Sequence, residues 1–474
     1  MTSPLPTHLD GATAPGPWFP TLTPTEHADS ERSSTYPQAS PEVRDWAEQG
    51  RALEVRVRHL PGPDGGWPAA TREPGELFLY NGAVAFDRMG GARVTRVDTR
   101  ALCVEWTRQL NDTRTTGEWN YPGSVGVLAD GYVYAAYGYR LSRLDPRSGE
   151  VLGTVELPTG SSRLDTTYNG FVALPDGNVV AKSMHRKPGT RANGFWALAR
   201  GGLVGTPSDL PVVDPRTLQV VSNLTAPEHL LGRVTAAVHR GKTYVYASGI
   251  NNIYRFAYEA GVLRLDEGWG PVRYRQEGEA PGSAITAGDG WIFIQANAGP
   301  GLTPFHIHAV SQDDGTRIHR LQPFPGHPLS FNASKLTYDA PNRRVYTTDG
   351  IIGKLACYDF DPDAGFTKRW EVEQGSYSFL VLVGPPDRRV LVSTELVDTW
   401  WSWLLRKKLA RYRRWLAYVI ARERVTWRHP DTGSLLARSG ELPAGLAVVP
   451  GEGGAIYYPT VFRGLYELRV QPRP

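Results

Sequence analysis

The feature that most constrains the fold is a repeat of four short β-strands separated by tight turns. Its clearest copy occupies residues 125–158, with the sequence VGVLADGYVYAAYGYRLSRLDPRSGEVLGTVELP. A first predicted strand ends at Asp130 and Gly131, the aromatic strand YVYAAY follows, and the strands RLSRLD and EVLGTVEL flank the turn PRSG. Turns rich in Gly, Pro and Asp join antiparallel neighbours, and four antiparallel strands make one blade of a β-propeller.

Related copies recur about every 35 to 60 residues, which is the spacing of propeller blades with loop insertions. They occupy residues 76–110, 168–227, 232–274, 282–324, 330–374 and 376–443. A last copy, residues 445–470, offers only three strands, and residues 53–59 (LEVRVRH) can supply the fourth. Closing the ring with strands from both ends removes exposed sheet edges. We therefore predict an all-β, eight-bladed propeller over residues 51–474, with seven blades as the alternative, preceded by an N-terminal tail or arm of residues 1–50.

Three copies of the repeat share a distinctive turn. LDPRSGEVLGTVEL, DFDPDAGFTKRWEV and HPDTGSLLARSGEL each place an Asp at a strand end, a Gly in a short turn, and a further strand after it. This pattern resembles the quinoprotein-type propeller repeat, in which the following strand often carries Trp. The resemblance implies the fold and leaves function open, because that superfamily includes quinone-dependent alcohol dehydrogenases, non-catalytic scaffolds and lyases.

In the quinone-dependent dehydrogenases the cofactor lies between a Trp and a disulfide of adjacent cysteines, beside a calcium ion. The present chain contains only Cys103 and Cys357, far apart in the sequence. We expect two buried, unpaired thiols rather than a disulfide. The sequence therefore predicts no quinone-dependent dehydrogenase, no cofactor and no bound metal ion.

Net charge and hydropathy limit the cellular locations and the binding partners that the sequence predicts. The net charge of +4 gives no reason to expect nucleic acid as a partner. Residues 1–20 lack the basic and apolar regions of a secretory signal, and no apolar run is long enough to span a bilayer. We expect a cytoplasmic protein, and the sequence leaves its oligomeric state open.

One segment departs from this near-neutral balance. Residues 396–424, LVDTWWSWLLRKKLARYRRWLAYVIARER, contain no Gly or Pro, and their spacing predicts an amphipathic helix. From Asp398 to Arg424 there are eight basic and two acidic residues, a net charge of +6. An aromatic and aliphatic face opposite a basic face is typical of a helix that lies in a membrane interface, where anionic lipid adds about 1 kcal/mol per basic residue.

This pattern predicts contact with an anionic membrane surface, at the inner face of the membrane. The residues expected to touch lipid are Trp401, Leu405, Tyr412, Trp415, Leu416 and Val419. Two other arrangements remain open: the apolar stripe packs on the propeller or on a second copy of the chain, or the basic face meets an acidic partner.

Propeller topology predicts where a site would lie. The connection between the second and third strands of a blade emerges on the same face as the links between blades. Two such connections are expanded, at residues 185–210 and 396–424, and long loops in compact domains are often functional. Polar residues at the starts of inner strands and the ends of second strands should surround the mouth of the channel there.

We predict acid–base catalysis by Asp165, His185 and Glu395, with Lys335 stabilising negative charge. The residues predicted to bind substrate are Tyr168, Asn169, Arg233, Asn332, Tyr377 and Asn120. Together with the basic helix, they suggest a peripheral-membrane enzyme that transforms an apolar, lipid-like or isoprenoid small molecule by isomerisation, elimination, cyclisation or hydrolysis. The alternative is a non-catalytic scaffold that binds protein partners through the same face.

Overall fold

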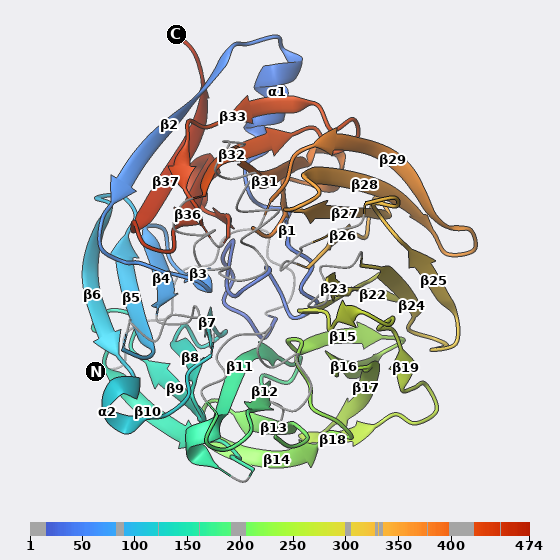
Figure 1. Cartoon of the computed structure of the whole chain (residues 1–474). Helices are drawn as coiled ribbons and strands as arrows, with labels where there is room; N and C mark the ends of the chain where they lie inside the picture. The colour runs from blue at the N-terminus through green and yellow to red at the C-terminus, as the bar shows by residue number, and fades with distance from the viewer. Residues whose placement is uncertain are drawn as a thin grey trace.

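The structure is a computed structural model that describes residues 16–81, 90–121, 123–160, 162–190, 205–298, 305–327, 330, 335–376, 378–397, 421–445 and 447–474. In this part of the chain, eight sheets of four or more strands are arranged as blades around a central axis (Figure 1). The predicted all-β, eight-bladed propeller is confirmed, and the seven-bladed alternative is wrong.

Each blade is an antiparallel sheet whose first strand lies nearest the axis and whose fourth strand lies at the rim (Figure 1). Blades 1 and 2 contain β3 (Ala69–Thr71), β4 (Glu76–Asn81), β5 (Arg93–Asp98), β6 (Cys103–Gln109), β7 (Ser124–Val127), β8 (Val133–Tyr137), β9 (Arg140–Leu144) and β10 (Val151–Glu156). Blades 3 and 4 contain β11 (Thr166–Ala173), β12 (Val179–His185), β13 (Asp209–Asp214), β14 (Gln219–Thr225), β15 (Thr235–His239), β16 (Lys242–Ser248), β17 (Asn252–Glu259) and β18 (Val262–Leu265).

The second half of the ring follows the same order. Blades 5 and 6 contain β21 (Ile285–Gly288), β22 (Trp291–Gln295), β24 (Ile307–Ser311), β25 (Ile318–Leu321), β26 (Thr337–Asp339), β27 (Arg344–Asp349), β28 (Lys354–Asp361) and β29 (Gly365–Glu373). Blades 7 and 8 contain β30 (Val381–Val383), β31 (Val390–Leu396), β32 (Arg422–Arg428), β33 (Leu435–Arg438), β35 (Val449–Pro450), β36 (Ala455–Pro459), β37 (Leu465–Pro472) and β2 (Leu53–Leu60). Two short helices, α1 (Glu42–Glu48) and α2 (Thr113–Thr116), lie outside the blades.

The core lies between neighbouring blades. Every residue of β8 (VYAAY) is buried, whereas those of the rim strand β10 are exposed or half-buried. Between blades 5 and 6, the ring of Phe293 packs 4.0 Å from that of Tyr338 and 5.0 Å from that of Phe360, measured between centroids. A middle strand is covered on both faces, which explains why these strands are continuous apolar runs in the sequence.

A tryptophan on the fourth strand of one blade docks on the Asp–Gly turn of the next. Trp106 Nε1 donates to the carbonyl of Pro146 at 3.3 Å, and Trp370 Nε1 donates to that of Pro430 at 2.8 Å. Gly149 in the first of these turns has φ of +68°, and a Cβ there would lie 2.7 Å from the Trp106 ring. The repeat therefore joins blades as well as forming turns, which accounts for the Asp, Gly and Trp positions seen in the sequence.

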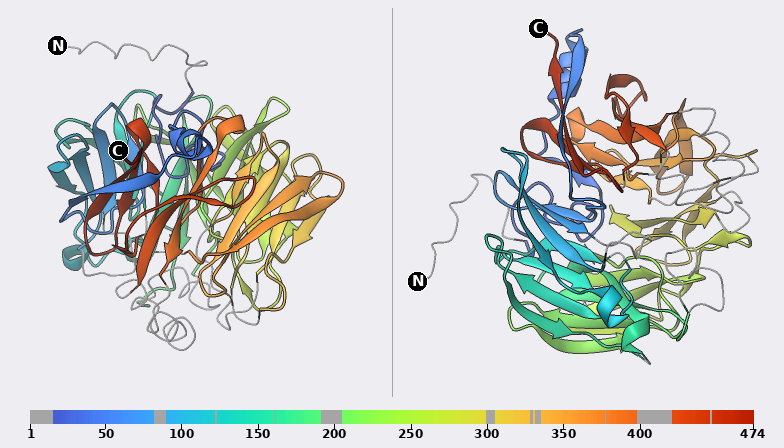
Figure 2. Two further views of the ribbon diagram at one scale, coloured as in Figure 1. Left: turned by 90° about the horizontal axis from the view of Figure 1, so that it is seen from above. Right: turned by 60° about the vertical axis from the view of Figure 1, so that its left-hand side comes forward.

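Strands from the two ends of the chain close the ring. β2 pairs antiparallel with β37 along its whole length, from Leu53 opposite Pro472 to Leu60 opposite Leu465. Figure 2 shows the blue β2 lying beside the red β37. Blade 8 is thus made of three C-terminal strands and one N-terminal strand, and its pairing holds blades 7 and 1 in one ring.

Residues 16–36, here called the axial segment, run inside the ring (Figure 1). Their backbone exchanges hydrogen bonds with the inner strands of blades 2, 4 and 5, at Val127, Ala236 and Ala287. β1 (Thr35–Tyr36) then pairs in parallel with β30, up to Val383. Val127 and Val383 are the last residues of β7 and β30, which are the first strands of their blades. The axial segment therefore fills the axis from the face of the propeller that carries the turns between first and second strands.

The predicted amphipathic helix falls largely in residues 398–420, outside the described part of the chain, together with all six of its predicted membrane-contact residues. Within the described residues, no helix is long and apolar enough to cross a membrane. Both cysteines are free; Cys357 is buried and Cys103 is exposed. The expectation of a buried thiol is wrong for Cys103, because every residue of the rim strand β6 except the half-buried Trp106 is exposed.

Candidate functional site

The axis holds a buried ionic cluster centred on Glu26 of the axial segment. The Glu26 carboxylate lies 3.2 Å from Nη1 of Arg32 and 3.1 Å from Nε of Arg233, and all three side chains are at most 8% exposed. Burial alone would raise the pKa of Glu26, but Arg233, His27 and Arg32 outweigh it and lower this pKa to about 2. Glu26 is therefore ionised at neutral pH and holds both guanidinium groups.

Arg233, which was predicted to bind substrate, connects the axial segment to several blades. Its guanidinium donates two hydrogen bonds of 3.2 Å to the carbonyl of Gly123 and another to that of Asn169. It also lies over the ring of Trp67, 5.2 Å from the centroid. Arg233 thus fixes Glu26 relative to blades 1, 2 and 3.

His27 lies beside Glu26 and is buried. Its ring packs edge-on against Phe379 at 4.6 Å, Nδ1 lies 3.1 Å from Oγ of Ser34, and Nε2 lies 3.4 Å from Glu26 Oε1. Burial lowers the pKa of His27 to about 3, more than the raising effect of Glu26 compensates. The imidazole is therefore neutral at pH 7.

Two buried lysines flank this cluster. Lys182 Nζ donates to the carbonyls of Leu230 and Leu231, at 2.9 and 3.4 Å. Burial holds the pKa of Lys182 well below its usual range, and Arg233 and Arg32 lower it further. No carboxylate among the described residues forms an ion pair with this amine, so nothing there compensates its charge.

Lys335, predicted to stabilise negative charge, lies at the axis just before β26. Its Nζ donates to Oγ1 of Thr286 at 2.9 Å and to the carbonyl of Leu336 at 3.0 Å. Burial and then Arg32 lower the pKa of Lys335 to about 7, although Asp29 and Glu26 oppose this. As with Lys182, no described carboxylate pairs directly with the amine. Among the described residues at the axis, Glu26 therefore pairs with Arg32 and Arg233, while Lys182 and Lys335 have no carboxylate partner.

Asp165 and His185 are brought together by the pairing of β11 with β12, which sets Thr166 opposite His185. Asp165 ends the short 3₁₀ helix Arg163–Asp165, and its carboxylate accepts hydrogen bonds from Arg186 Nε at 2.8 Å and from Ser162 Oγ at 2.9 Å. The carboxylate of Asp165 is therefore already neutralised by Arg186.

His185 sits in a separate network of hydroxyl groups. Its Nδ1 lies 2.8 Å from Oγ1 of Thr166, and its Nε2 lies 2.9 Å from Oγ of Ser183. The carboxylate of Asp209 is 3.6 Å from Nε2. Burial would raise the pKa of Asp209, but hydrogen bonds, the largest with His185, lower it. Both imidazole nitrogens are thus occupied by partners within blade 3.

The third predicted acid, Glu395, does not join this group. It lies in blade 7, across the ring from blade 3, and accepts a hydrogen bond from Arg438 of the rim strand β33 at 3.2 Å (Figure 1). The structure therefore brings Asp165 near His185, but it separates both from Glu395.

The predicted substrate-binding residues mostly bind the protein itself. Tyr168 donates its hydroxyl to the carbonyl of Pro158 at 2.7 Å, and Asn169 Nδ2 lies 3.5 Å from the carbonyl of Leu231. Asn120 Oδ1 accepts from the Tyr80 hydroxyl and from the Gly138 amide, at 3.2 and 3.1 Å. Asn332 and Tyr377 lie outside the described residues.

Sequence reasoning missed the contribution of the axial segment. Glu26, His27 and Arg32 stand in the run EHADSER, inside a stretch otherwise rich in Pro, Ser and Thr. Such a dense cluster of ionisable residues within a polar tail is the one signal that could have pointed to an ordered role. Within the described residues, no group of three or more His, Cys, Asp or Glu side chains could hold a metal ion.

Comparisons with known proteins agree on the architecture. No protein-family model and no curated protein match the chain. Among solved structures, a quinohemoprotein alcohol dehydrogenase from Comamonas testosteroni superposes with a TM-score of 0.59 at 13% identity, covering 96% of this chain and 81% of that one. BamB from Moraxella catarrhalis follows with a TM-score of 0.51 at 12% identity, covering 88% of this chain and all of BamB. The fold is that of a quinoprotein-like propeller.

A computationally designed protein, Ika8, is also similar, with a TM-score of 0.50 at 12% identity and coverage of 86% of this chain and 97% of that one. At these identities the likeness shows the fold alone. The function of this quinoprotein-like propeller must therefore be inferred from its own side chains.

Proposed function

We propose that the protein is an enzyme that acts on an anionic small molecule held beside Lys335 at the propeller axis. The observation that carries the proposal is the burial of the Lys335 and Lys182 amines with no carboxylate partner among the described residues. A buried ammonium group is costly unless it is paired, so such an amine either loses its proton or binds an anion. Lysines with strongly shifted pKa values are concentrated at functional sites.

The pKa of Lys335 suits proton transfer. With a pKa of about 7, the amine is populated both with and without its extra proton near neutral pH. As a base, the neutral amine removes a proton from the substrate and becomes an ammonium group. That ammonium then stabilises the negative charge left on the substrate, as required for isomerisation or elimination.

The substrate class follows from the charges. Arg32 and Arg233 already share the Glu26 carboxylate, whereas Lys182 and Lys335 pair with no described carboxylate, so the two lysines are the groups proposed to bind a carboxylate or phosphate. The axial segment covers the face with the first-to-second-strand turns, and the substrate therefore arrives from the opposite face. An apolar body on this anion, as the sequence suggests, remains part of the proposal.

Lys335→Met tests the site, because Met keeps the length and shape of the side chain while removing its charge. Wild-type protein is expected to gain thermal stability with phosphate or with octanoate, and not with neutral octanol. The variant should lose about 10- to 100-fold in affinity for the effective anion, the range for a hydrogen bond to a charged group. Wild-type affinity should also fall as the pH rises through about 7, where the amine loses its proton.

Lys335→Met should change the stability of the ligand-free protein little, because relief from burying a charged amine offsets the two hydrogen bonds lost to Thr286 and Leu336. Lys242→Met in blade 4, at an exposed lysine, is the matched control and should bind the anion like the wild type. Comparing phosphate with octanoate distinguishes a phosphate from a carboxylate substrate. If neither anion stabilises the wild type, or if Lys335→Met binds as well as the wild type, the proposed site is wrong.

We also propose, from the sequence pattern, that residues 396–424 bind an anionic membrane surface. The net charge of +6 opposite a face of Trp, Tyr and Leu supports this. Intact protein should float with vesicles containing phosphatidylglycerol, less so at high salt, and not with pure phosphatidylcholine. A Trp401→Ala/Trp415→Ala variant should stay in the lipid-free fraction. Equal recovery of both proteins without lipid would contradict membrane binding and favour packing against protein.

A further inference from the structure

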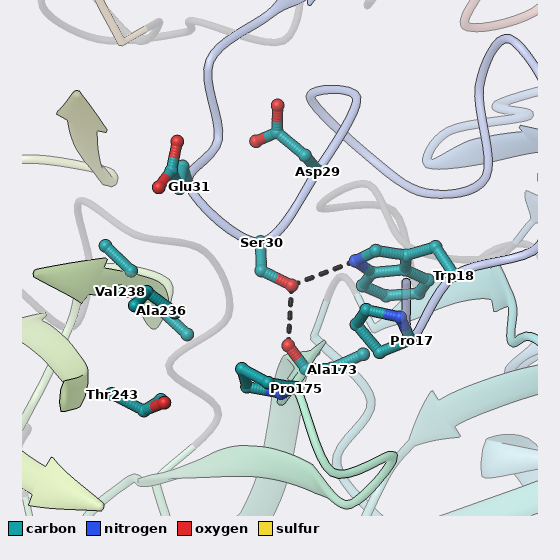
Figure 3. A pocket seen from close by; sticks show the side chains of 11 residues that line it. Pro17, Trp18, Asp29, Ser30, Glu31, Ala173, Pro175, Ala236, Val238 and Thr243 are labelled. Atoms are coloured by element: carbon teal, nitrogen blue, oxygen red, sulfur yellow. Dashed lines mark hydrogen bonds between the residues drawn. The ribbon is translucent and has the colours of Figure 1, made fainter. Parts of the chain in front are cut away.

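A pocket that Lys335 does not line lies between blades 3 and 4, under the axial segment. It has a volume of about 250 Å³. The axial segment contributes Trp18, Asp29 and Glu31, and the two blades contribute Pro175, Ala236 and Val238 from the opposite side (Figure 3). The pocket is thus built from three separate parts of the chain.

One wall of the pocket is apolar and held in place by hydrogen bonds. Trp18 Nε1 donates to Oγ of Ser30 at 2.9 Å, and that hydroxyl donates to the carbonyl of Ala173 at 2.7 Å (Figure 3). The indole ring also packs against Phe171, with 6.0 Å between centroids. Across the pocket, Val238 is 55% exposed although it lies in a strand. Fixed apolar walls with a few polar groups are typical of small-molecule sites.

The polar side of the pocket carries two carboxyl groups. Asp29 accepts hydrogen bonds from the amide and the hydroxyl of Ser33, at 3.0 and 2.5 Å. Glu31, in contrast, has no side-chain hydrogen bond or ion pair within the described part of the chain. Burial and the neighbouring Asp29 raise the pKa of Glu31 to about 7. Burial raises the pKa of Asp29 as well, although the hydrogen bonds from Ser33 and the charge of Lys335 oppose this. Within the described residues, Glu31 is therefore the pocket carboxyl group that has no hydrogen-bond or ionic partner.

From this geometry we infer that the pocket binds a small organic ammonium ion with an apolar body. The ammonium group pairs with Glu31, and the body fills the space between Trp18 and Val238. An indole face also attracts a nearby cation. The carboxyl groups of Asp29 and Glu31 disfavour binding in this pocket of the anions proposed for the Lys335 site. The two sites therefore take ligands of opposite charge and can be tested separately.

The test titrates the intact protein with 2-phenylethylammonium, and with 2-phenylethanol and 3-phenylpropanoate as neutral and anionic analogues, by calorimetry. We expect the amine to bind and both analogues to bind at least about 10-fold more weakly. Glu31→Gln should weaken amine binding about 10-fold or more without lowering stability, since it removes an uncompensated charge. Glu259→Gln, an exposed acid in blade 4, is the matched control and should bind like the wild type.

Lys335→Met should not weaken amine binding, because Lys335 does not line the pocket and its positive charge, which acts on Asp29, opposes a bound cation. Loss of anion binding in this variant, with amine binding kept, would separate the two proposals. Three results would overturn the ammonium site: no amine binding at millimolar concentration, equal affinity for 2-phenylethanol, or unchanged amine affinity in Glu31→Gln.

Discussion

Glu26→Ala is expected to lower the free energy of unfolding by about 3–5 kcal/mol, the usual cost of removing one partner of a buried ion pair. The variant leaves the guanidinium groups of Arg32 and Arg233 buried without their carboxylate. It should also loosen the axial segment, because Glu26 is the group that binds this segment to Arg233 of blade 4. Urea unfolding followed by tryptophan fluorescence measures the difference.

Glu48→Ala is the matched control, since Glu48 also pairs with an arginine in the N-terminal part of the chain. The Glu48 side chain is 53% exposed and lies 2.7 Å from Arg44. An exposed pair of this kind contributes about 0–1 kcal/mol. A loss of less than about 1 kcal/mol for Glu26→Ala would show that the cluster around Glu26 does not hold the axial segment.

Acidification should destabilise the protein already at pH values well above the pKa values of ordinary carboxyl groups. Burial lowers the pKa of His27, His229 and His308 to about 3 in the folded chain. In the unfolded chain each imidazole takes up a proton near pH 6.5. Between about pH 6.5 and 3 the unfolded state therefore binds more protons, and each histidine reduces stability by about 1.4 kcal/mol per pH unit as the pH falls.

Glu31 acts in the opposite direction. Its pKa of about 7 lies above that of the unfolded chain, so the stability it contributes is present below pH 4.5 and is lost as the pH rises through about 7. At pH 5 the stabilisation from Glu31 offsets the destabilisation from about one histidine. The free energy of unfolding should therefore be about 4 kcal/mol lower at pH 5 than at pH 7. Urea unfolding at pH 7 and pH 5 measures it.

His308→Phe should reduce that pH dependence by about 2 kcal/mol, since His308 is fully buried and neither ring nitrogen has a hydrogen-bond partner in the described structure. The same variant should be at least as stable as the wild type at pH 7, because it removes two unsatisfied polar atoms. Equal stability of the wild type at both pH values would show that these imidazoles are not held neutral.

The fold could be predicted because its information is local. The Asp–Gly turn and the Trp that docks on it recur along the chain, and continuous apolar runs mark the buried middle strands. The closeness of Asp165 and His185 also follows from a simple hairpin. Glu395 could not be placed, because the direction of a side chain near a strand end depends on its rim partner, here Arg438.

The axial segment was beyond sequence reasoning for a different reason. It has neither helical nor strand periodicity, and its hydrogen-bond partners are spread over distant blades, at Val127, Ala236 and Ala287. Lys335 was predicted to face negative charge at the axis, but the low pKa of its amine depends on burial and on Arg32 of that segment. The electrostatics of the site thus depend on a part of the chain that the pattern left out.

The pairing of β2 with β37 has a consequence for biosynthesis. Residues 53–60 are translated before their partner strand, residues 465–472, and most of the other seven blades lie between them in the chain. The nascent chain therefore carries β2 unpaired while the intervening blades are synthesised. Contacts between such distant residues form slowly and leave the chain open to aggregation meanwhile. Residues 16–36 must already lie inside the ring when β2 pairs with β37. Synthesis that stops before β37 would therefore release a chain whose ring is not closed.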